Sequence, residues 1–501
     1  MIFRLFVVSL ILLFSNLANA APIRVWPSAP SGKPIDIVYP RETDSLGRVT
    51  LAAYIDSTFL LGNVANPLIT KLAINGKPVT IDSGGGWIAW LKTPSRQHDF
   101  TWSLVAITGS DTNRLAIPVV RTGSPSIAPP IKLKSPFWAL TKEGARFRNS
   151  PTGKNILLPM TNTPVKIQAK SRTNYFAKLP DGTGVWMDSA KIIRTKKQPA
   201  TGVITKVSMQ VDKQKRLTTV QLIGAIPTSF HYEYDEQNRK LTFRLQNAKV
   251  KPGLKIACLA GSLVEKIEFF ENNKDVVVNV SIANQYKYLG YRWETDSLGL
   301  ALTLREAPPP SAEPNRPLVG WRIVVDPGHG GVEYGSIGPT WFAEKTANLD
   351  VSNRLTKRLL ELGAEVKQTR TTDTVMALTD RVAIAENWQA DILLSVHHNA
   401  LPDGNNPWDS TGTAVYFFHS HSEGLAKTLY KRLLVRLALP ERGVYVGDFA
   451  ICRSQPQLSV LTEAAFMIRP EQERKLRTEE FRQLEAEALA EGLVDFVQMS
   501  R

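Results

Sequence analysis

The chain has 501 residues, which is too many for one compact core and predicts several domains. Hydrophobic residues make up 43% of the chain and charged residues 21%, a balance that excludes a disordered chain or a membrane-embedded one. The formal net charge of +15 favours an anionic partner such as a wall polymer, lipid head groups or nucleic acid, with basicity lacking any specific partner as the alternative.

The first 20 residues are typical of an export signal. Arg4 supplies a positive start, residues 5–14 form an apolar core, and Ala18-Asn19-Ala20 is a small-residue cleavage pattern. The apolar run is shorter than the roughly 20 residues that span a bilayer, so we predict a cleaved signal peptide over residues 1–20 rather than a membrane anchor or a buried helix. We therefore expect an exported protein of the periplasm or cell envelope, with no transmembrane anchor and no nucleic-acid partner.

Proline-rich segments at residues 122–130 and 307–317 divide the chain. The second segment contains five prolines and is predicted to be an extended, semi-rigid spacer. Cys258 and Cys452 are the only cysteines, and they lie in different predicted domains. We expect both to be buried apolar side chains, so a metal site has to use histidines and carboxylates.

Three β-rich segments are predicted before the second proline-rich segment. In residues 21–121, Leu72-Ala73-Ile74 and Val79-Thr80-Ile81 flank Asn75-Gly76, which predicts a hairpin. This segment resembles the immunoglobulin-like domains attached to secreted carbohydrate-active enzymes, and the resemblance implies a β-sandwich.

Residues 133–195 combine short strand patterns with turns such as Asp181-Gly182. They resemble a bacterial Src-homology-3-like barrel, a family often found on wall hydrolases, with a generic β-barrel as the alternative. Residues 201–305 alternate as half-buried strands do. They are similar to the AMIN type of β domain, which localises envelope proteins.

The pattern changes after Pro317, where strands alternate with helices. We predict strands over residues 322–326, 366–369, 391–396, 413–418 and 458–463, and helices over 344–362, 378–388, 422–437 and 471–498. This alternation predicts an α/β domain over residues 320–499, with a mostly parallel sheet covered by helices on both faces. In such sheets the functional groups gather beyond the carboxyl ends of the strands.

Four side chains near strand ends suit hydrolysis at a metal: His329, Glu344, His397 and Glu463. Catalytic zinc commonly takes two imidazoles and a carboxylate and leaves a position open for water. A second carboxylate is needed to accept the proton of that water and pass it to the leaving group.

Each of the four residues also has a structural explanation. His329 could be a loop histidine bonded to backbone carbonyls, and Glu344 could complement the positive end of a helix. His397 and His398 are adjacent on a strand, so their side chains point to opposite faces and at most one binds metal. Glu463 is hardest to explain structurally, because burying a carboxylate without purpose costs several kcal/mol. The spacing of these residues in the sequence supports a metal site and a purely structural role about equally.

Residues 322–497 resemble the catalytic domain of zinc N-acetylmuramoyl-L-alanine amidases. The matching motifs, in family order, are DPGHGG, EKTANL, TRTTD, the predicted helix with Arg381 and Glu386-Asn387, SVHHNA, GTAVYF and VLTEAAF. The resemblance implies that His329, Glu344 and His397 bind Zn²⁺, that Glu463 is the catalytic carboxylate and that His398 binds no metal. Ala465 departs from the family, which usually has glycine there, and Glu333 replaces a common aspartate.

The resemblance implies a peptidoglycan hydrolase that cleaves the bond between N-acetylmuramic acid and L-alanine, in wall remodelling and daughter-cell separation. It also implies that envelope activator or division proteins could bind the N-terminal modules. The alternatives are a zinc peptidase acting within the stem peptide and a non-catalytic wall-binding scaffold. Only about a dozen residues separate Asn399 from Gly412, so we expect an ordinary loop there rather than a helix that plugs the cleft.

Overall fold

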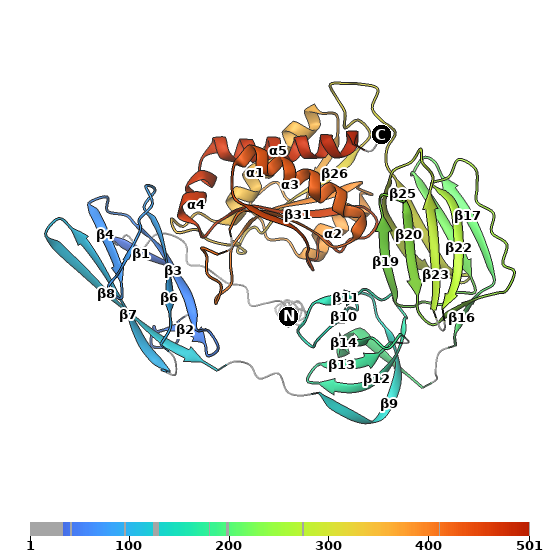
Figure 1. Cartoon of the computed structure of the whole chain (residues 1–501), viewed down its shortest axis with the longest axis horizontal. Coiled ribbons are helices and arrows are strands. Elements are labelled where there is room, and N and C mark those ends of the chain that lie inside the picture. The colour runs from blue at the N-terminus through green and yellow to red at the C-terminus, as the bar shows by residue number, and fades with distance from the viewer. Residues whose placement is uncertain are drawn as a thin grey trace, which may run out of the picture.

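The computed structural model describes residues 34–499, apart from 41–42, 95–96, 124–129, 180, 197–199, 273–274 and 410. These residues form three β modules and a C-terminal α/β domain (Figure 1). The predicted signal peptide and most of the first proline-rich segment lie outside the described residues. Within the described residues, no helix has the length and apolar character needed to cross a membrane.

The first module is a sandwich of two sheets. One sheet has the order β1-β3-β6 and the other β2-β8-β7-β4-β5. Trp87 and Trp102 are buried between them with aliphatic side chains. The strands are β1 (Ile35–Tyr39), β2 (Val49–Ala52), β3 (Ser57–Val64), β4 (Ile69–Ile74), β5 (Lys77–Val79), β6 (Gly86–Lys92), β7 (Asp99–Thr108) and β8 (Asp111–Thr122).

The hairpin predicted in this module is confirmed. Strands β4 and β5 pair antiparallel, with Ile74 opposite Lys77. Asn75 and Gly76 occupy the turn with φ of 49° and 76°, the left-handed conformation that a two-residue hairpin of this kind requires.

The second module is one curved sheet of order β11-β10-β14-β13-β12-β9-β15 around a small core that includes Phe147 and Ile167. Its strands are β9 (Ile131–Thr141), β10 (Phe147–Arg148), β11 (Asn155–Leu157), β12 (Pro164–Ser171), β13 (Asn174–Lys178), β14 (Gly184–Asp188) and β15 (Ile192–Thr195), with a 3-10 turn η1 at Ser189–Lys191.

The third module packs two four-stranded sheets, β17-β18-β25-β24 and β19-β20-β23-β22, around one core, beside a short parallel pair β16-β21. Its strands are β16 (Gly202–Ile204), β17 (Lys206–Asp212), β18 (Leu217–Ile223), β19 (Phe230–Asp235), β20 (Lys240–Leu245), β21 (Ala248–Val250), β22 (Val264–Asn272), β23 (Asp275–Ile282), β24 (Tyr288–Thr295) and β25 (Gly299–Glu306). Cys258 is half-buried at the edge of this core, so the expectation that it is buried was wrong, whereas Cys452 in the C-terminal domain is fully buried; both are free thiols.

The C-terminal domain is built on a six-stranded sheet of order β27-β26-β28-β31-β29-β30. Four of the five strand pairings are parallel, and β29 runs antiparallel to β31. The elements are β26 (Arg322–Pro327), α1 (Glu344–Glu361), β27 (Glu365–Gln368), α2 (Leu378–Asn387), β28 (Ile392–Asn399), β29 (Thr413–Phe417), η2 (Ser420–Ser422), α3 (Glu423–Leu437), β30 (Glu441–Val446), β31 (Leu458–Phe466), α4 (Pro470–Leu476) and α5 (Glu479–Gln498).

Helices cover both faces of this sheet. The helices α1, α3 and α5 lie over one face and α2 lies on the other (Figure 1). Leu394, Val396 and Val460 are fully buried under the first group. Val324 and Leu393 point the other way and pack with Ala385 of α2. Strands buried on both faces explain the continuous apolar runs in the sequence.

Two details of this domain differ from the sequence prediction. The single helix predicted over residues 471–498 is two helices. Helix α4 ends at Leu476, and Thr478 caps the start of α5, its side chain accepting a hydrogen bond from the N–H of Phe481. Strand β30 was not predicted; its exposed edge position gives ERGVYV little hydrophobic periodicity.

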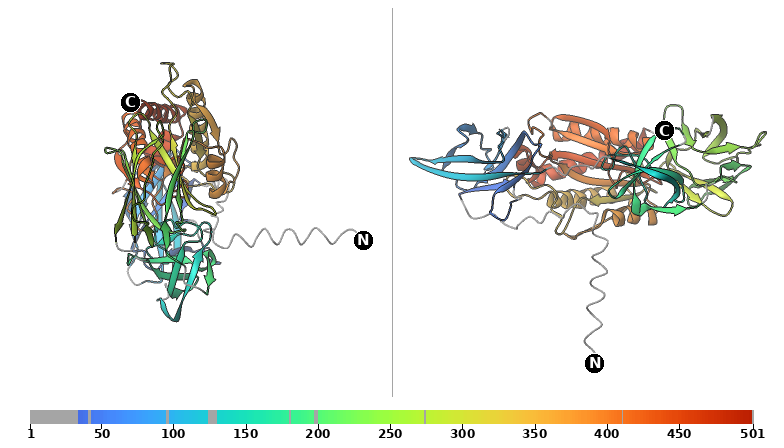
Figure 2. Two further views of the ribbon diagram at one scale, coloured as in Figure 1. Left: turned by 90° about the vertical axis from the view of Figure 1, so that its right-hand side faces the viewer. Right: turned by 90° about the horizontal axis from the view of Figure 1, so that it is seen from below.

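The C-terminal domain lies between the first and third modules (Figure 2). The sequence predicts that the spacer at residues 307–317 holds its two neighbours apart. In the structure, the third module and the C-terminal domain instead contact each other directly. Tyr291 N–H of the third module donates to Gln455 O at 2.9 Å, and Arg216 pairs with Asp391 at 2.6 Å. Leu289 of the third module is fully buried in the core of the C-terminal domain, and burial of apolar surface favours direct packing over an extended connection.

Candidate functional site

The loop that follows β26 carries the first candidate residue. His329 has a φ of 59°, an unusual left-handed conformation for a residue with a side chain. A Cβ on Gly328 would lie 2.2 Å from His397 Cε1, and a Cβ on Gly335 would lie 2.5 Å from Glu344 Oε2. These glycines let the backbone approach the side chains of the site, which explains the glycine-rich sequence around His329.

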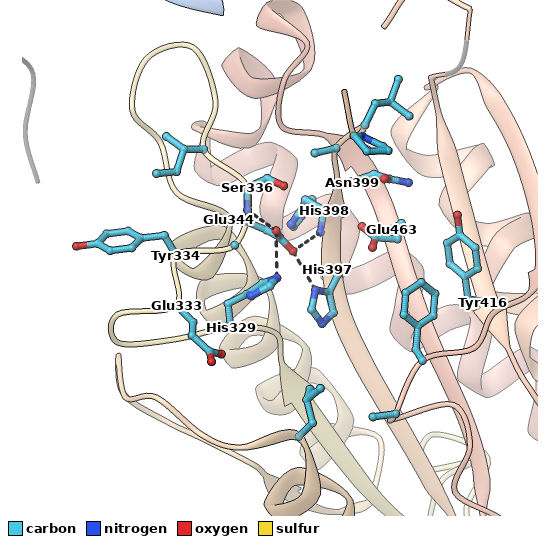
Figure 3. Close-up of a pocket in the computed structure, with 18 of the residues that line it drawn as sticks. His329, Glu333, Tyr334, Ser336, Glu344, His397, His398, Asn399, Tyr416 and Glu463 are labelled. Carbon is cyan, nitrogen blue, oxygen red and sulfur yellow. Dashed lines mark hydrogen bonds and ion pairs between the residues drawn. The ribbon is translucent and has the colours of Figure 1, made fainter. Parts of the chain in front are cut away.

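Three of the four candidates converge at one point. The nearest side-chain nitrogens and carboxylate oxygens of His329, Glu344 and His397 all lie within 4.8 Å of one another, as a shared metal ion requires. Glu344 Oε2 is 3.3 Å from His329 Nε2, and Oε1 is 2.9 Å from His397 Nδ1. Figure 3 shows the two imidazoles directed at opposite oxygens of the same carboxylate.

Glu344 begins α1 and is buried. Its carboxylate accepts hydrogen bonds from the backbone N–H groups of Ser336 (2.8 Å) and His398 (3.2 Å), and from Asn348 Nδ2 (3.3 Å). Burial alone would raise the pKa of Glu344, but the charge of His329 and the bonds to both histidines outweigh it and hold the pKa well below its usual range. Glu344 is therefore a fixed, ionised carboxylate.

The pKa values of the two histidines are shifted in opposite directions. Burial opposes the charged form of His329, but the adjacent Glu344 more than compensates and raises the pKa. Burial dominates for His397 and lowers the pKa of this imidazole, in spite of its bond to Glu344. A metal ion takes the neutral imidazole, and the buried His397 favours that form.

Glu463 lies beside this cluster but outside it. Parallel strands β28 and β31 place Glu463 directly opposite His397 in the sheet. Its Oε2 is buried and has no hydrogen-bond partner. Burial, followed by the negative charge of Glu344, raises the pKa of Glu463 well above its usual range. A buried carboxylate oxygen without a hydrogen-bond partner is costly, and a carboxyl group with a raised pKa in a cleft is typical of sites that exchange protons.

His398 points away from the cluster, as the alternation of strand residues predicted. Its ring nitrogens lie 2.8 Å from Asn348 Oδ1 and 2.9 Å from Glu485 Oε2, which joins β28 to α1 and α5. These contacts give His398 a structural role in the helix-covered core.

Sequence reasoning did not assign the buried pair Asp326 and Arg381. Arg381 Nη1 donates to Asp326 Oδ1 and to Pro327 O, both at 2.7 Å, and Nη2 donates to His329 O at 2.8 Å. The guanidinium thus holds the loop that presents His329. The family motif singles out Arg381 in the sequence. Its role could not be predicted, because its partner Asp326 lies 55 residues away along the chain.

Two further unpaired polar atoms were missed. Asn399 Nδ2 and Arg442 Nη1 are buried without a hydrogen-bond partner among the described residues. The charge of Arg442 acts on Glu463 and opposes the rise in its pKa. The SVHHNA motif contains Asn399 and could have indicated that this residue belongs to the site. Arg442 lies in the unpredicted strand β30, and no motif indicated it.

The four candidates line one large cleft, of about 2020 Å³. Figure 3 shows Glu463, Asn399 and Tyr416 on one side of His397, and His329 and Glu333 on the other. The described residues between Asn399 and Gly412 contain no helix, as expected for an ordinary loop, so this segment does not plug the cleft.

A family model described as N-acetylmuramoyl-L-alanine amidase matches residues 323–495. The protein YqiI of Bacillus subtilis (strain 168) is 34% identical over 206 residues, which are 40% of this chain and 95% of YqiI. The N-acetylmuramoyl-L-alanine amidase LytC of the same strain is 32% identical over 180 residues, which are 36% of each chain. Among solved structures, the amidase AmiC2 of Nostoc punctiforme is 30% identical and covers 36% of this chain and 97% of that one, with a TM-score of 0.34.

The family model and the match to YqiI define the class of the C-terminal domain: the chain belongs to the N-acetylmuramoyl-L-alanine amidase family. It is an amidase of this class, and enzymes of the class act on peptidoglycan in cell-wall remodelling. The family model covers residues 323–495 of the C-terminal domain, and the chain spans only about a third of LytC.

Proposed function

We propose that the C-terminal domain is a zinc-dependent amidase that cleaves the bond between N-acetylmuramic acid and the L-alanine of the stem peptide. The observation that carries this proposal is the convergence of two imidazoles and one buried carboxylate within 4.8 Å, next to a second carboxylate that is not part of the cluster. Two histidines and one glutamate form a donor set that zinc takes in hydrolases, with a further position left for water or substrate.

His329, Glu344 and His397 are the proposed ligands. Bound zinc supplies Lewis acidity, which polarises the scissile carbonyl and makes water a nucleophile near neutral pH. The hydrogen bonds of Glu344 to Ser336, Asn348 and His398 hold its carboxylate in place. Arg381 does the same for the loop of His329. Ligands held in this way do not have to reorganise when an ion binds.

Glu463 is the proposed general acid and base. It accepts a proton from the attacking water and returns it to the leaving amine of L-alanine, so that the protons balance over one turnover. Burial, followed by the charge of Glu344, raises the pKa of Glu463. Zinc held by His329, Glu344 and His397 would offset the charge of Glu344 and so favour the ionised form of Glu463 that a base needs.

The three β modules support action at the cell envelope. We propose that they are an immunoglobulin-like, a Src-homology-3-like and an AMIN-like domain, in chain order, over residues 21–121, 133–195 and 201–305, preceding the catalytic domain at 320–499. In this proposal the protein is exported by a signal peptide over residues 1–20, acts in the periplasm or envelope during daughter-cell separation, and binds envelope activator or division proteins through these modules. The net charge of +15 suits an anionic wall polymer.

Digestion of purified peptidoglycan, with and without a chelator, tests this function. We expect mass spectrometry to find intact stem peptides with a free L-alanine amine, together with peptide-free glycan, and the chelator to stop their release. Cleavage within the stem would identify a zinc peptidase instead. No digestion with zinc supplied would favour a non-catalytic scaffold.

A further inference from the structure

The cleft that contains the candidate site is not confined to the C-terminal domain. The first module contributes to its lining through Thr50, Ala52, Tyr54 and Ile55, and the second module contributes Arg146. Its volume of about 2020 Å³ exceeds the roughly 300–1,000 Å³ of sites that bind small molecules. A cleft of this size, walled by three parts of the chain, suits a polymer better than a single sugar-peptide unit.

Polar contacts fix the first module against the loops that carry the candidate ligands. Asp403, in the loop after β28, accepts hydrogen bonds from Tyr39 Oη at 2.6 Å and Thr58 Oγ1 at 2.8 Å. On the other side of the site, Trp341 Nε1, in the loop between His329 and α1, donates to Asp36 Oδ2 at 3.1 Å. The module therefore contacts both loops that border the site.

An apolar cluster reinforces these contacts. Val38, Phe59 and Leu61 of the first module pack with Ile337 and Phe466 of the C-terminal domain, and all five are buried. Burial of this kind contributes about 1.5–3 kcal/mol per large side chain. The first module is thus packed against the C-terminal domain, so the surface that it adds to the cleft has a fixed position.

The second module is also fixed near the cleft. Asn155 donates through its backbone N and through Nδ2 to the two carboxylate oxygens of Asp448, both at 2.8 Å. Asp448 in turn accepts a hydrogen bond from Arg453 at 2.6 Å. Arg453 and Arg146 both line the cleft, and because Arg453 is paired with Asp448, one net positive charge lies at this end of it.

The side chains on the two module walls suit a charged glycopeptide. Tyr54 is 71% exposed, and an exposed aromatic face in a cleft is a surface on which a sugar ring packs. Arg146 has neither a hydrogen-bond nor an ion-pair partner among the described residues, and partial burial together with the charge of Arg453 lowers the pKa of its guanidinium. An unpaired arginine beside a second one is suited to the carboxylates of a peptide stem.

We propose that the first two β modules form part of the substrate site, and that Tyr54 and Arg146 bind polymeric peptidoglycan outside the C-terminal domain. Tyr54 contacts the glycan strand beyond the cleaved unit, and Arg146 contacts carboxylates of a neighbouring peptide stem on the polymer. The enzyme therefore prefers polymeric wall over a single disaccharide-peptide. This inference rests on the proposed function, because it extends the same cleft.

The test compares the full chain with the double variant Tyr54→Ala/Arg146→Gln on two substrates, insoluble peptidoglycan and a purified disaccharide-peptide. We expect the double variant to raise KM for the polymer about tenfold, with kcat within about twofold, and to leave kinetics on the disaccharide-peptide unchanged. The matched control is Leu68→Ala/Lys166→Gln: Leu68 is 66% exposed on the first module, Lys166 is exposed on the second, and neither lines the cleft.

A binding measurement separates this inference from the proposed function. In a Glu463→Ala background, co-sedimentation with peptidoglycan should weaken about tenfold when Tyr54→Ala/Arg146→Gln is added, and should not change with the control pair. Unchanged binding and unchanged KM on the polymer, or an equal loss on both substrates, overturns the inference. A chain that hydrolyses neither substrate refutes the proposed function, and the binding result still decides this inference.

Discussion

Two glutamates in one cleft have opposite electrostatic environments. Glu344 accepts several hydrogen bonds and lies between two imidazoles, so its pKa is held well below the usual range, while burial and the charge of Glu344 raise the pKa of Glu463 well above it. Neighbouring titratable groups whose pKa values diverge are a common basis for dividing roles within an active site. At the residue scale, this divergence supports Glu344 as ligand and Glu463 as acid and base.

Substitution of each proposed group should separate metal binding from turnover. We expect Glu463→Ala to lower kcat by a factor of about 10²–10⁴ while zinc stays bound, because its carboxylate is outside the cluster. His329→Ala should lower the zinc content as well as activity. Metal analysis of the purified variants checks both, and loss of zinc from Glu463→Ala would contradict the role assigned to Glu463.

Glu473 gives a residue-scale prediction about pH. This α4 side chain is 1% exposed, and its Oε1 accepts hydrogen bonds from Thr340 N at 2.9 Å and Thr340 Oγ1 at 2.8 Å. Burial raises its pKa from 4.5 to about 7. Since folding raises the pKa, the protonated form stabilises the fold at low pH, and about 3 kcal/mol of stability is lost as pH rises from about 4.5 to about 7.

Glu473→Gln should remove this dependence, because the amide does not ionise. The free energy of unfolding of the variant, relative to the wild type, is expected to rise by up to about 3 kcal/mol between pH 4.5 and pH 8. Denaturant unfolding across this range provides the measurement. The exposed Glu480→Gln should follow the wild-type curve, and parallel curves for all three proteins would contradict the prediction.

At the scale of elements, α2 holds the end of β26 and the loop that follows. Arg381 from α2 is 2% exposed and bonds to the Asp326 side chain and to two backbone carbonyls, including that of His329. The charge of Arg381 and hydrogen bonds from Ser395 and Thr369 outweigh burial and lower the pKa of Asp326. The helix therefore fixes the position of a candidate ligand that it does not itself carry.

Arg381→Ala leaves Asp326 as a buried charge without its partner. We expect a loss of about 3–5 kcal/mol in stability and a lower affinity for zinc, because the loop of His329 loses its support. Thermal unfolding and a zinc titration measure the two effects. The control is Arg358→Ala on α1, whose pairs with Glu361 and Glu487 are partly exposed and contribute at most about 1 kcal/mol.

At the scale of the whole molecule, the third module and the C-terminal domain form one packed unit. Arg216 Nη2 lies 2.6 Å from the buried Asp391, Arg292 pairs with Glu386 at 2.8 Å, and Tyr232 Oη is 3.0 Å from His421 Nδ1. Interfaces with buried charge pairs and aromatic groups resist relative motion of the domains. The third module therefore belongs to the folding unit of the enzyme.

Arg216→Ala should destabilise this interface. It removes the nearest partner of buried Asp391 and is expected to cost about 3 kcal/mol, since the carboxylate stays buried. Calorimetry of the full chain should show an earlier transition, while Lys215→Ala, which removes an exposed pair with Asp212, should leave it unchanged. Identical transitions for the two variants would contradict the importance of the buried pair.

Much of the fold could be predicted, because turns and helix starts depend on interactions between residues close together in the sequence. The turn at Asn75-Gly76 needs only its own two residues to adopt a left-handed conformation, and the start of α1 at Glu344 follows from local periodicity. The break between α4 and α5 was not predicted, because helical periodicity continues through it. The edge strand β30 was not predicted, because its hydrophobic periodicity is weak.

The sequence by itself determined the order of strands and helices, the residue types of the site and the family motif that contains them. Only the tertiary structure decided that Glu463 lies opposite His397, that Arg381 reaches the loop of His329, and that the first two modules wall the cleft. The physical reason is distance along the chain. Periodicity and turn chemistry act over a few residues, whereas these contacts depend on how whole sheets and modules pack.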